Sequence, residues 1–230
     1  MSRTSARPAR YLLHSPLRTA ARALLSARWE FHITPGGFPA TGPVIVAANH
    51  IGVIDGPLLA IMSPRPVHAL TKAEMFHGAA GVFFRESGQI RLDRFHPDRA
   101  AIRSSLAALD AGDAVGIFPE GTRGGGELAS IHAGTAYLGM VSGAPIVPLT
   151  FFGTRLPGAG NSSLPPRGSR IDLVFGEPLV LDQVKWPRTR DNVQIATQRV
   201  HAHLLAHLAA TQAATGLTLP GPLPASEDER

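Results

Sequence analysis

The sequence predicts one α/β domain built on a largely parallel mixed sheet that is flanked by helices. Short apolar runs, suited to buried strands, alternate along the chain with segments of helical periodicity. Glycine and proline mark many of the boundaries between these segments. The 230 residues, 44% of them hydrophobic, suffice for one sizeable core, and no shift in composition indicates a second.

The first predicted element is a basic amphipathic helix. Ser15 and Pro16 predict its start, because serine caps helix N-termini and proline is tolerated at the first helical position, and it continues to about Trp29. It carries apolar residues and arginines, namely Leu17, Ala21, Leu24, Leu25, Arg18, Arg22 and Arg28. Such a helix can lie in a membrane interface, or it can pack on the domain. We interpret residues 1–29 as a membrane-docking segment, with packing on the domain as the alternative.

The domain proper is predicted to span residues 30–212. Its first half contains a strand at 44–48, a helix at 56–62, a strand at 67–71, a helix at 74–86, a strand at 89–92 and a helix at 98–111. Its second half contains a strand at 114–118, a helix at 133–142, a strand at 146–151, a surface loop at 153–170, a strand at 171–175 and a helix at 191–210. The proline-rich acidic tail, residues 213–230, is expected to be disordered.

Composition narrows the classes of function. The net charge of +5 and the pI near 10.6 favour anionic partners such as nucleic acid, anionic lipid or phosphorylated substrates. Nucleic-acid binding is disfavoured, because aromatic residues make up only 6% of the chain and six arginines cluster within the first thirty residues. The absence of cysteine excludes disulfides, thiolate metal sites and a cysteine nucleophile.

Two further classes of feature are not expected. The long uncharged stretches 31–54 and 128–154 both contain histidine and proline, so we predict no transmembrane helix, and we predict no secretory signal. His203 and His207 have the spacing of metal ligands, but Leu204 stands where a zinc protease has glutamate. We therefore predict that these histidines face solvent and that the chain holds no metal.

His50 and Asp55 lie where a buried strand is predicted to end and a helix to begin, the edge at which open α/β sheets bind ligands. Histidine is the usual general base near neutral pH, and a carboxylate on its other ring nitrogen sets the tautomer and stabilises the imidazolium. A main-chain N–H at the start of the following helix is the candidate oxyanion donor. On the spacing alone, a pair that caps a helix is the favoured alternative.

A second segment, Phe-Pro-Glu-Gly-Thr-Arg at residues 118–123, follows another strand and has parts that suit phosphate. Gly121 permits close approach of the backbone, Thr122 offers a hydroxyl and Arg123 offers a bidentate cationic fork. Arg94 and Lys72 follow two more strands and can join Arg123 on one dianionic phosphate. The alternative, a tight turn with a surface arginine, is disfavoured because two such segments share one sheet edge.

Four ordered segments carry a family resemblance. They are Asn49-His50-x4-Asp55, Gly88-x-Ile90-x-Leu92-Asp93-Arg94, the 118–123 segment and Ala144-Pro145-Ile146-Val147-Pro148. In these segments the chain resembles the 1-acylglycerol-3-phosphate (lysophosphatidic acid) acyltransferases, which are His-x4-Asp glycerolipid acyltransferases. Gly52, His132 and Arg91 depart from the family's usual serine, lysine and apolar residue, which puts the acceptor preference in doubt.

The resemblance implies a glycerolipid acyltransferase-like fold and direct acyl transfer. His50, oriented by Asp55, deprotonates the sn-2 hydroxyl of 1-acyl-sn-glycerol-3-phosphate, which attacks the thioester of acyl carrier protein or coenzyme A and gives phosphatidic acid. The residues implied to bind the acceptor phosphate are Arg94, Glu120, Gly121, Thr122 and Arg123, among which Glu120 shapes the loop. Lys72 is our own addition to this set. Pro145, Ile146, Val147 and Pro148 are implied to line the acyl site.

The implied enzyme needs no cofactor beyond its acyl donor and sits at the cytoplasmic face of the cell membrane as a peripheral or monotopic protein, on anionic lipid. No Gly-x-Ser-x-Gly segment occurs, which weakens a serine hydrolase interpretation. Two alternatives stay open. The same chemistry can act on another lysophospholipid or glycolipid acceptor, or the chain can be a non-catalytic protein that binds lipid phosphate, against which the intact His50 and Asp55 argue.

Overall fold

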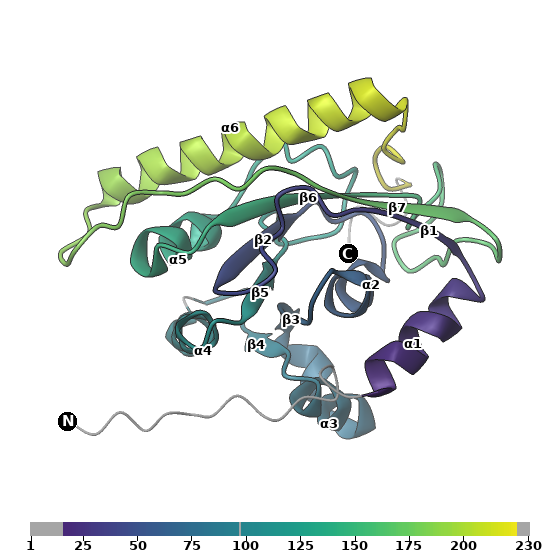
Figure 1. Ribbon diagram of the computed structural model, residues 1–230, viewed down its shortest axis with the longest axis horizontal. Helices are drawn as coiled ribbons and strands as arrows, with labels where there is room; N and C mark the ends of the chain where they lie inside the picture. The colour runs from purple at the N-terminus through teal and green to yellow at the C-terminus, as the bar shows by residue number, and fades with distance from the viewer. Residues whose placement is uncertain (1–15, 97, 225–230) are drawn as a thin grey trace.

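A computed structural model describes residues 16–96 and 98–224, and within them seven strands form one sheet. The strands are β1 (Glu30–Thr34), β2 (Val44–Ala48), β3 (Val67–Lys72), β4 (Ile90–Leu92), β5 (Ala114–Ile117), β6 (Ile146–Phe152) and β7 (Arg170–Phe175). Their order across the sheet is β1-β7-β6-β2-β5-β3-β4 (Figure 1). Only the β6–β7 pair is antiparallel among these described strands, which confirms the predicted largely parallel mixed sheet.

Strand β2 lies at the centre of this sheet and is buried on both faces. Val44, Val46 and Ala48 pack into the core on one side, whereas Ile45 and Ala47 pack into the core on the other. A strand that is covered on both faces reads as a continuous apolar run, and this is the run from which the strand was predicted.

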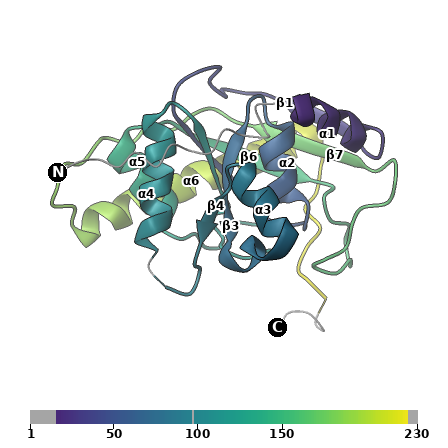
Figure 2. The ribbon, with the colours of Figure 1, turned by 90° about the horizontal axis from the view of Figure 1, so that it is seen from below.

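Helices cover both faces of the sheet. One face carries α4 (Arg99–Asp110), α5 (Gly134–Ser142) and α6 (Arg190–Thr215), and α6 runs across the sheet (Figure 1). The other face carries α1 (Pro16–Ser26) and α2 (Asp55–Met62). The 3₁₀ helix η2 (Ala73–Phe76) and helix α3 (Gly78–Glu86) lie beside β3 and β4 (Figure 2).

Most predicted elements are confirmed, with three differences in the domain. Strand β1 was missed, because its side chains alternate between exposed and half-buried at the sheet's edge and form no apolar run. The helix predicted at 74–86 is divided into η2 and α3, since the chain turns at Gly78, where φ is +57°. Helix α6 extends five residues beyond the predicted end at 210, to Thr215.

The tail was predicted to be disordered from residue 213, and this is wrong for the part that the structure describes. Helix α6 ends at Gly216, whose φ of +69° is the left-handed conformation of a helix C-cap. The chain then returns over the domain, with Leu217 and Leu219 packed on the core and Pro220 buried. Residues 225–230 lie outside the described residues.

Helix α1 matches the predicted amphipathic helix from its first proline, whereas Ser15 lies outside the described residues. The helix was predicted to continue to about Trp29, but α1 ends at Ser26, and Trp29 is buried and donates from Nε1 to the carbonyl of Pro165 at 3.0 Å. Arg18 donates to the carbonyls of Ile61 and Ser63, which attaches α1 to the end of α2. Within the described helix no side chain is buried, and Leu17 and Leu24 are 56% and 74% exposed.

Histidines attach α6 to the rest of the domain. His203 and His207 were predicted to face solvent, but their Nε2 atoms lie 2.8 Å and 3.0 Å from the carbonyl oxygens of Glu177 and Val174. His201 contacts the carbonyl of Leu128 in the same way, at 2.6 Å. Among the described residues, no group of three or more His, Cys, Asp or Glu side chains is placed to hold a metal ion. No helix in the described ranges is long and apolar enough to cross a membrane.

Candidate active site

The predicted site residues gather at one edge of the sheet because the strands that precede them are parallel. Strands β2, β3, β4 and β5 all end at this edge. Asn49 continues β2, and its buried side chain donates to the carbonyl of Phe151 and accepts from the Phe151 amide at 2.7 Å. These two hydrogen bonds extend the pairing of β2 with β6 by one residue. They therefore fix the direction of the chain where His50 follows the strand.

His50 and Asp55 form the predicted pair. Nδ1 of His50 lies 2.9 Å from Oδ2 of Asp55, whose side chain is fully buried. The same oxygen accepts from the amides of Ile51 and Gly52 at 2.7 Å and 2.8 Å. An oxygen that accepts from two amides also accepts from Nδ1–H, so Nε2 is left as the nitrogen that can take a proton. The two amides serve Asp55, and the predicted oxyanion donor at this helix start is therefore not one of them.

The ring of His50 is held by a second segment. It stacks on Phe118 with centroids 4.1 Å apart and planes 22° from parallel. The amide of His50 donates to Oε1 of Glu120 at 2.9 Å. Glu120 was predicted among the phosphate residues, but its half-buried carboxylate faces main-chain amides. Glu120 therefore helps to hold the 49–52 segment, the base loop, which carries His50.

Glu120 also supports an unusual turn. Its carboxylate accepts from the amide of Leu128, a buried residue with a φ of +56°. Such a conformation in a leucine costs free energy and persists only where neighbours enforce it. Burial is the main cause that raises the pKa of Glu120, to about 7, against the opposing effect of the His50 and Leu128 amides.

Lys72, Arg94 and Arg123 line one cavity. The pKa of Lys72 is lowered, mainly by burial and next by the positive charges of Arg94 and Arg123. Arg94 donates from Nη1 to the carbonyl of Gly121 at 3.2 Å, while its buried Nε has no hydrogen-bond partner among the described residues. Arg123 donates from Nη1 to the carbonyl of Asn161 at 3.0 Å. Three cations this close favour a ligand with more than one negative charge.

These cations line one part of a cavity of about 1410 Å³. Gly121 and Thr122 line it beside them, and the glycine has a φ of +74°, with the ring of His132 only 2.7 Å from where a Cβ would lie. The wall continues into an apolar part made by Leu70, Leu92, Ile102, Leu106, Ile117, Tyr137 and Val193. The cavity thus joins a cationic part to a long apolar part.

The predicted acyl-site lining is corrected by this geometry. Pro145, Ile146, Val147 and Pro148 are not among the described residues that line the cavity. Ile146 pairs with Ile45 at the start of β2, whereas His50 follows the end of that strand, and Ile146, Val147 and Pro148 are buried in the core. The segment that the resemblance assigned to the acyl site instead forms the start of β6, the strand next to the central β2.

Sequence reasoning also missed Arg155, because the 153–170 segment was predicted to be a surface loop. Its side chain is only 1% exposed, and it donates to main-chain carbonyls around the base. The available signal was an arginine three residues after an apolar strand whose end lies at the same edge as His50.

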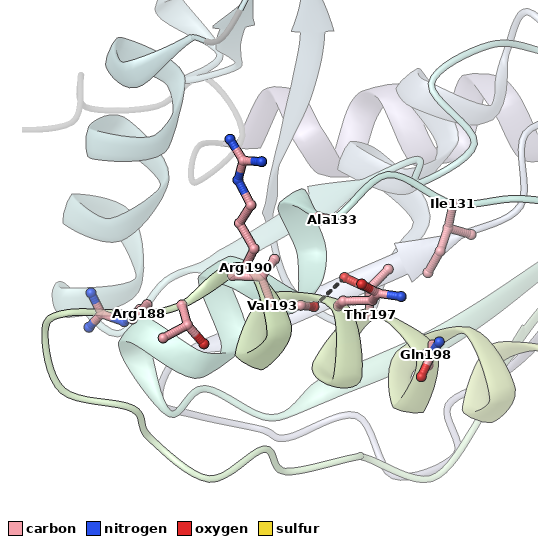
Figure 3. Close-up of a pocket in the computed structure, with 9 residues that line it drawn as sticks. Ile131, Ala133, Arg188, Arg190, Val193, Thr197 and Gln198 are labelled. Atoms are coloured by element: carbon pink, nitrogen blue, oxygen red, sulfur yellow. Dashed lines mark hydrogen bonds between the residues drawn. The ribbon is translucent and has the colours of Figure 1, made fainter.

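A second, shallower pocket of about 440 Å³ lies at the start of α6 (Figure 3). Arg188 and Arg190 stand at one end, and Ile131 and Gln198 at the other. It shares Ala133 and Val193 with the large cavity but none of the predicted site residues.

The pKa of Glu120 predicts a pH dependence of stability. Between pH 4.5, its ordinary pKa, and about 7, the folded protein keeps a proton on Glu120 that the unfolded chain releases, so this stabilising contribution is full below 4.5 and is lost as pH rises through about 7. We expect the Tm of the wild type to fall relative to that of Glu120→Gln across this range, measured by thermal unfolding of both. Parallel Tm curves would contradict the assignment.

The chain is similar to known proteins over much of its length. Residues 31–151 match the Acyltransferase family profile. The 1-acyl-sn-glycerol-3-phosphate acyltransferase of Bacillus subtilis (strain 168) is 28% identical over 163 residues, covering 70% of this chain and 79% of the relative. The enzyme of that name from Cocos nucifera is 28% identical over 180 residues, covering 73% of this chain and 54% of the relative.

Two further similarities add to this. The lyso-ornithine lipid O-acyltransferase of Pseudomonas aeruginosa is 31% identical over 130 residues, covering 55% of this chain and 50% of the relative. The crystal structure of the 1-acyl-sn-glycerophosphate (LPA) acyltransferase PlsC from Thermotoga maritima has the same fold, with a TM-score of 0.54 at 22% identity over 82% of this chain and 77% of that one. With more than half of its sequence matched by the family profile, the chain belongs to the Acyltransferase family.

Proposed function

We propose that this O-acyltransferase moves a fatty acyl group from an acyl thioester to the sn-2 hydroxyl of 1-acyl-sn-glycerol-3-phosphate, giving phosphatidic acid. The observation that carries the proposal is that His50 of the His50–Asp55 pair stacks on Phe118, which lines a cavity together with Lys72, Arg94, Arg123 and a long apolar wall. A lysophosphatidic acid has the matching chemistry, a phosphate at one end and an acyl chain at the other. The B. subtilis and C. nucifera relatives carry names for this reaction.

The reaction follows from the tautomer of His50. Nε2 of His50 takes the proton of the acceptor hydroxyl while the hydroxyl oxygen attacks the thioester carbonyl. The C–S bond then breaks, and the leaving thiolate receives this proton from the imidazolium of His50. Until then, Asp55 stabilises the charge of the imidazolium. The proposed reaction needs no acyl-enzyme and no cofactor, and the donor is a thioester of acyl carrier protein or coenzyme A.

The cationic part of the cavity is proposed to hold the acceptor phosphate. Arg94, whose Nε is buried without a partner, and Arg123 supply guanidinium donors, and Lys72 supplies an ammonium group. Gly121 and Thr122 complete the wall. We propose that the apolar part, between β3, β4 and α4, takes acyl chain in place of the 145–148 segment.

A second acceptor is favoured by one comparison. The P. aeruginosa relative, named for a lyso-ornithine lipid, is similar over 55% of this chain. An ornithine headgroup carries no phosphate, so the dependence of acceptor binding on Arg123 separates the two acceptors.

We also propose that the enzyme works on the cytoplasmic face of the cell membrane as a peripheral or monotopic protein. Leu17 and Leu24 leave an apolar surface on α1, and the exposed Arg28 follows this helix for contact with anionic headgroups. Arg18 and Arg22 do not share this role, since both donate to a carbonyl at the end of α2.

The first prediction concerns the base. Replacement His50→Ala should lower kcat by about 10²- to 10⁴-fold, the usual contribution of a general base, while the fold is kept. The measurement is transfer of radiolabelled acyl groups from acyl carrier protein and from coenzyme A to a panel of lysophospholipids. His32→Ala, which removes a histidine paired with Glu30 at the surface, is the matched control and should keep full activity. A His50→Ala enzyme with normal turnover would rule out the proposed base.

The second prediction concerns the phosphate. Arg123→Ala removes a charge-assisted contact worth about 1.5 to 3 kcal/mol, which should weaken binding of lysophosphatidic acid roughly 10- to 150-fold. The KM for the acceptor reports it, with Arg167→Ala, an exposed arginine outside the cavity, as control. An unchanged KM and kcat/KM would show that the phosphate binds elsewhere.

The third prediction concerns membrane docking. A Leu17→Ser/Leu24→Ser variant should bind vesicles that contain anionic lipid at least about tenfold more weakly, because two exposed leucines lose their apolar transfer energy. Flotation measures this, and Val180→Ser/Ile195→Ser, at similarly exposed positions on other elements, is the control. Equal loss in both variants would remove α1 as the docking element.

A further inference from the structure

Arg155 lies three residues after β6 and is almost completely buried. Nε donates to the carbonyl of Ile51 at 2.9 Å, and Nη1 donates to the carbonyl of Ala159 at 3.1 Å. Nη2 donates to the carbonyl of Gly124 at 3.0 Å and to that of Gly221. One guanidinium therefore joins main-chain oxygens from four different places in the sequence.

Two of these places flank the base. Ile51 directly follows His50, and the amide of Gly124 donates to the carbonyl of His50 at 2.9 Å. Arg155 thus contacts the carbonyl of Ile51 directly. Through Gly124, it also contacts the segment whose amide binds the carbonyl of His50. Asp55 binds only the ring of His50 and the amides of Ile51 and Gly52. The carbonyls of His50 and Ile51 therefore depend on the contacts made by Gly124 and Arg155.

The loop that carries Arg155 also touches both parts of the site directly. Gly52 lies against Thr154, so closely that a Cβ on Gly52 would come within 2.5 Å of the Thr154 carbonyl. Asn161, farther along the same loop, accepts the hydrogen bond from Arg123 and lines the cavity. The 153–161 segment therefore connects the base loop to the cationic part of the cavity.

We propose that Arg155 is a positioning residue for acyl transfer, which holds the His50 loop and the Arg123 loop at the spacing that the reaction needs. The proposal rests on the proposed function, in that it assigns His50 as base and Arg123 as a phosphate ligand. A guanidinium suits the task because its donors lie in one rigid plane and reach several carbonyls at once, whereas a lysine ammonium is a point charge on a flexible stem.

The test compares Arg155→Met and Arg155→Lys with Arg65→Met. Arg65 is a matched control, because it is half-buried and donates to the carbonyls of Gly112 and Gly42, which precede the starts of β5 and β2 at the opposite edge of the sheet. A displacement of about 1 Å at a reacting group can cost on the order of 100-fold in rate. We expect Arg155→Met to lower kcat by roughly that factor, with a change of less than about tenfold in acceptor KM.

Arg155→Lys guards against a variant that fails to fold, since it keeps the length and charge of the side chain. It should retain the circular dichroism of the wild type and still lose at least about tenfold in kcat, because an ammonium group cannot reproduce the planar set of contacts. Full activity of a folded Arg155→Lys enzyme would overturn the proposal.

A double-mutant cycle separates positioning from general destabilisation. If Arg155 acts through His50, adding Arg155→Met to His50→Ala should cost less than about threefold further in single-turnover rate. An equal loss in both backgrounds, or an equal loss in Arg65→Met, would assign Arg155 a stabilising role only. The cycle is run with the acceptor that the wild type acylates fastest. A failure of the proposed function would be seen separately, as equal transfer of label by the wild type and His50→Ala.

Discussion

The hydrogen bonds to Oδ2 of Asp55 are the interactions on which the rest of the site depends. This one buried oxygen accepts from Nδ1 of His50 and from the amides of Ile51 and Gly52, so it sets the tautomer of the base and the path of the chain around it. The turn is possible because Asn49 has already continued the β2 ladder onto β6 through Phe151. The orientation of His50 thus begins at the end of β2, where Asn49 lies six residues before Asp55, the first residue of α2.

Around this pair, the structure separates residues that support the base from residues that face the cavity. Glu120, Phe118 and Arg155 contact the base loop through its amide, its ring and its carbonyl. Lys72, Arg94 and Arg123 instead face a cavity whose far wall is apolar. The mutual repulsion of these cations is unfavourable, and a dianionic headgroup would relieve it. This division explains why one hexapeptide, residues 118–123, supplies both a carboxylate and an arginine.

The ends of the described chain are attached to the domain by polar contacts at defined points. Arg18 joins α1 to the carbonyls at the end of α2, while Leu17 and Leu24 remain exposed. At the other end, Gly221 accepts from Arg155 and Leu223 lines the cavity. The C-terminal segment is therefore part of the surroundings of the site, and α1 presents an apolar surface next to the same domain.

The sequence by itself determined the α/β class, the central strands and the residues at the active edge. Buried strands are continuous apolar runs, and the carboxyl ends of parallel strands meet at one edge, so His50, Asp55, Arg94 and Arg123 could be placed together before any coordinates. Tertiary structure alone decided which apolar run is core and which polar residue is support. The 145–148 segment packs inside the sheet, Glu120 faces amides, and Arg155 is buried, because burial and hydrogen-bond partners depend on contacts between segments distant in the sequence.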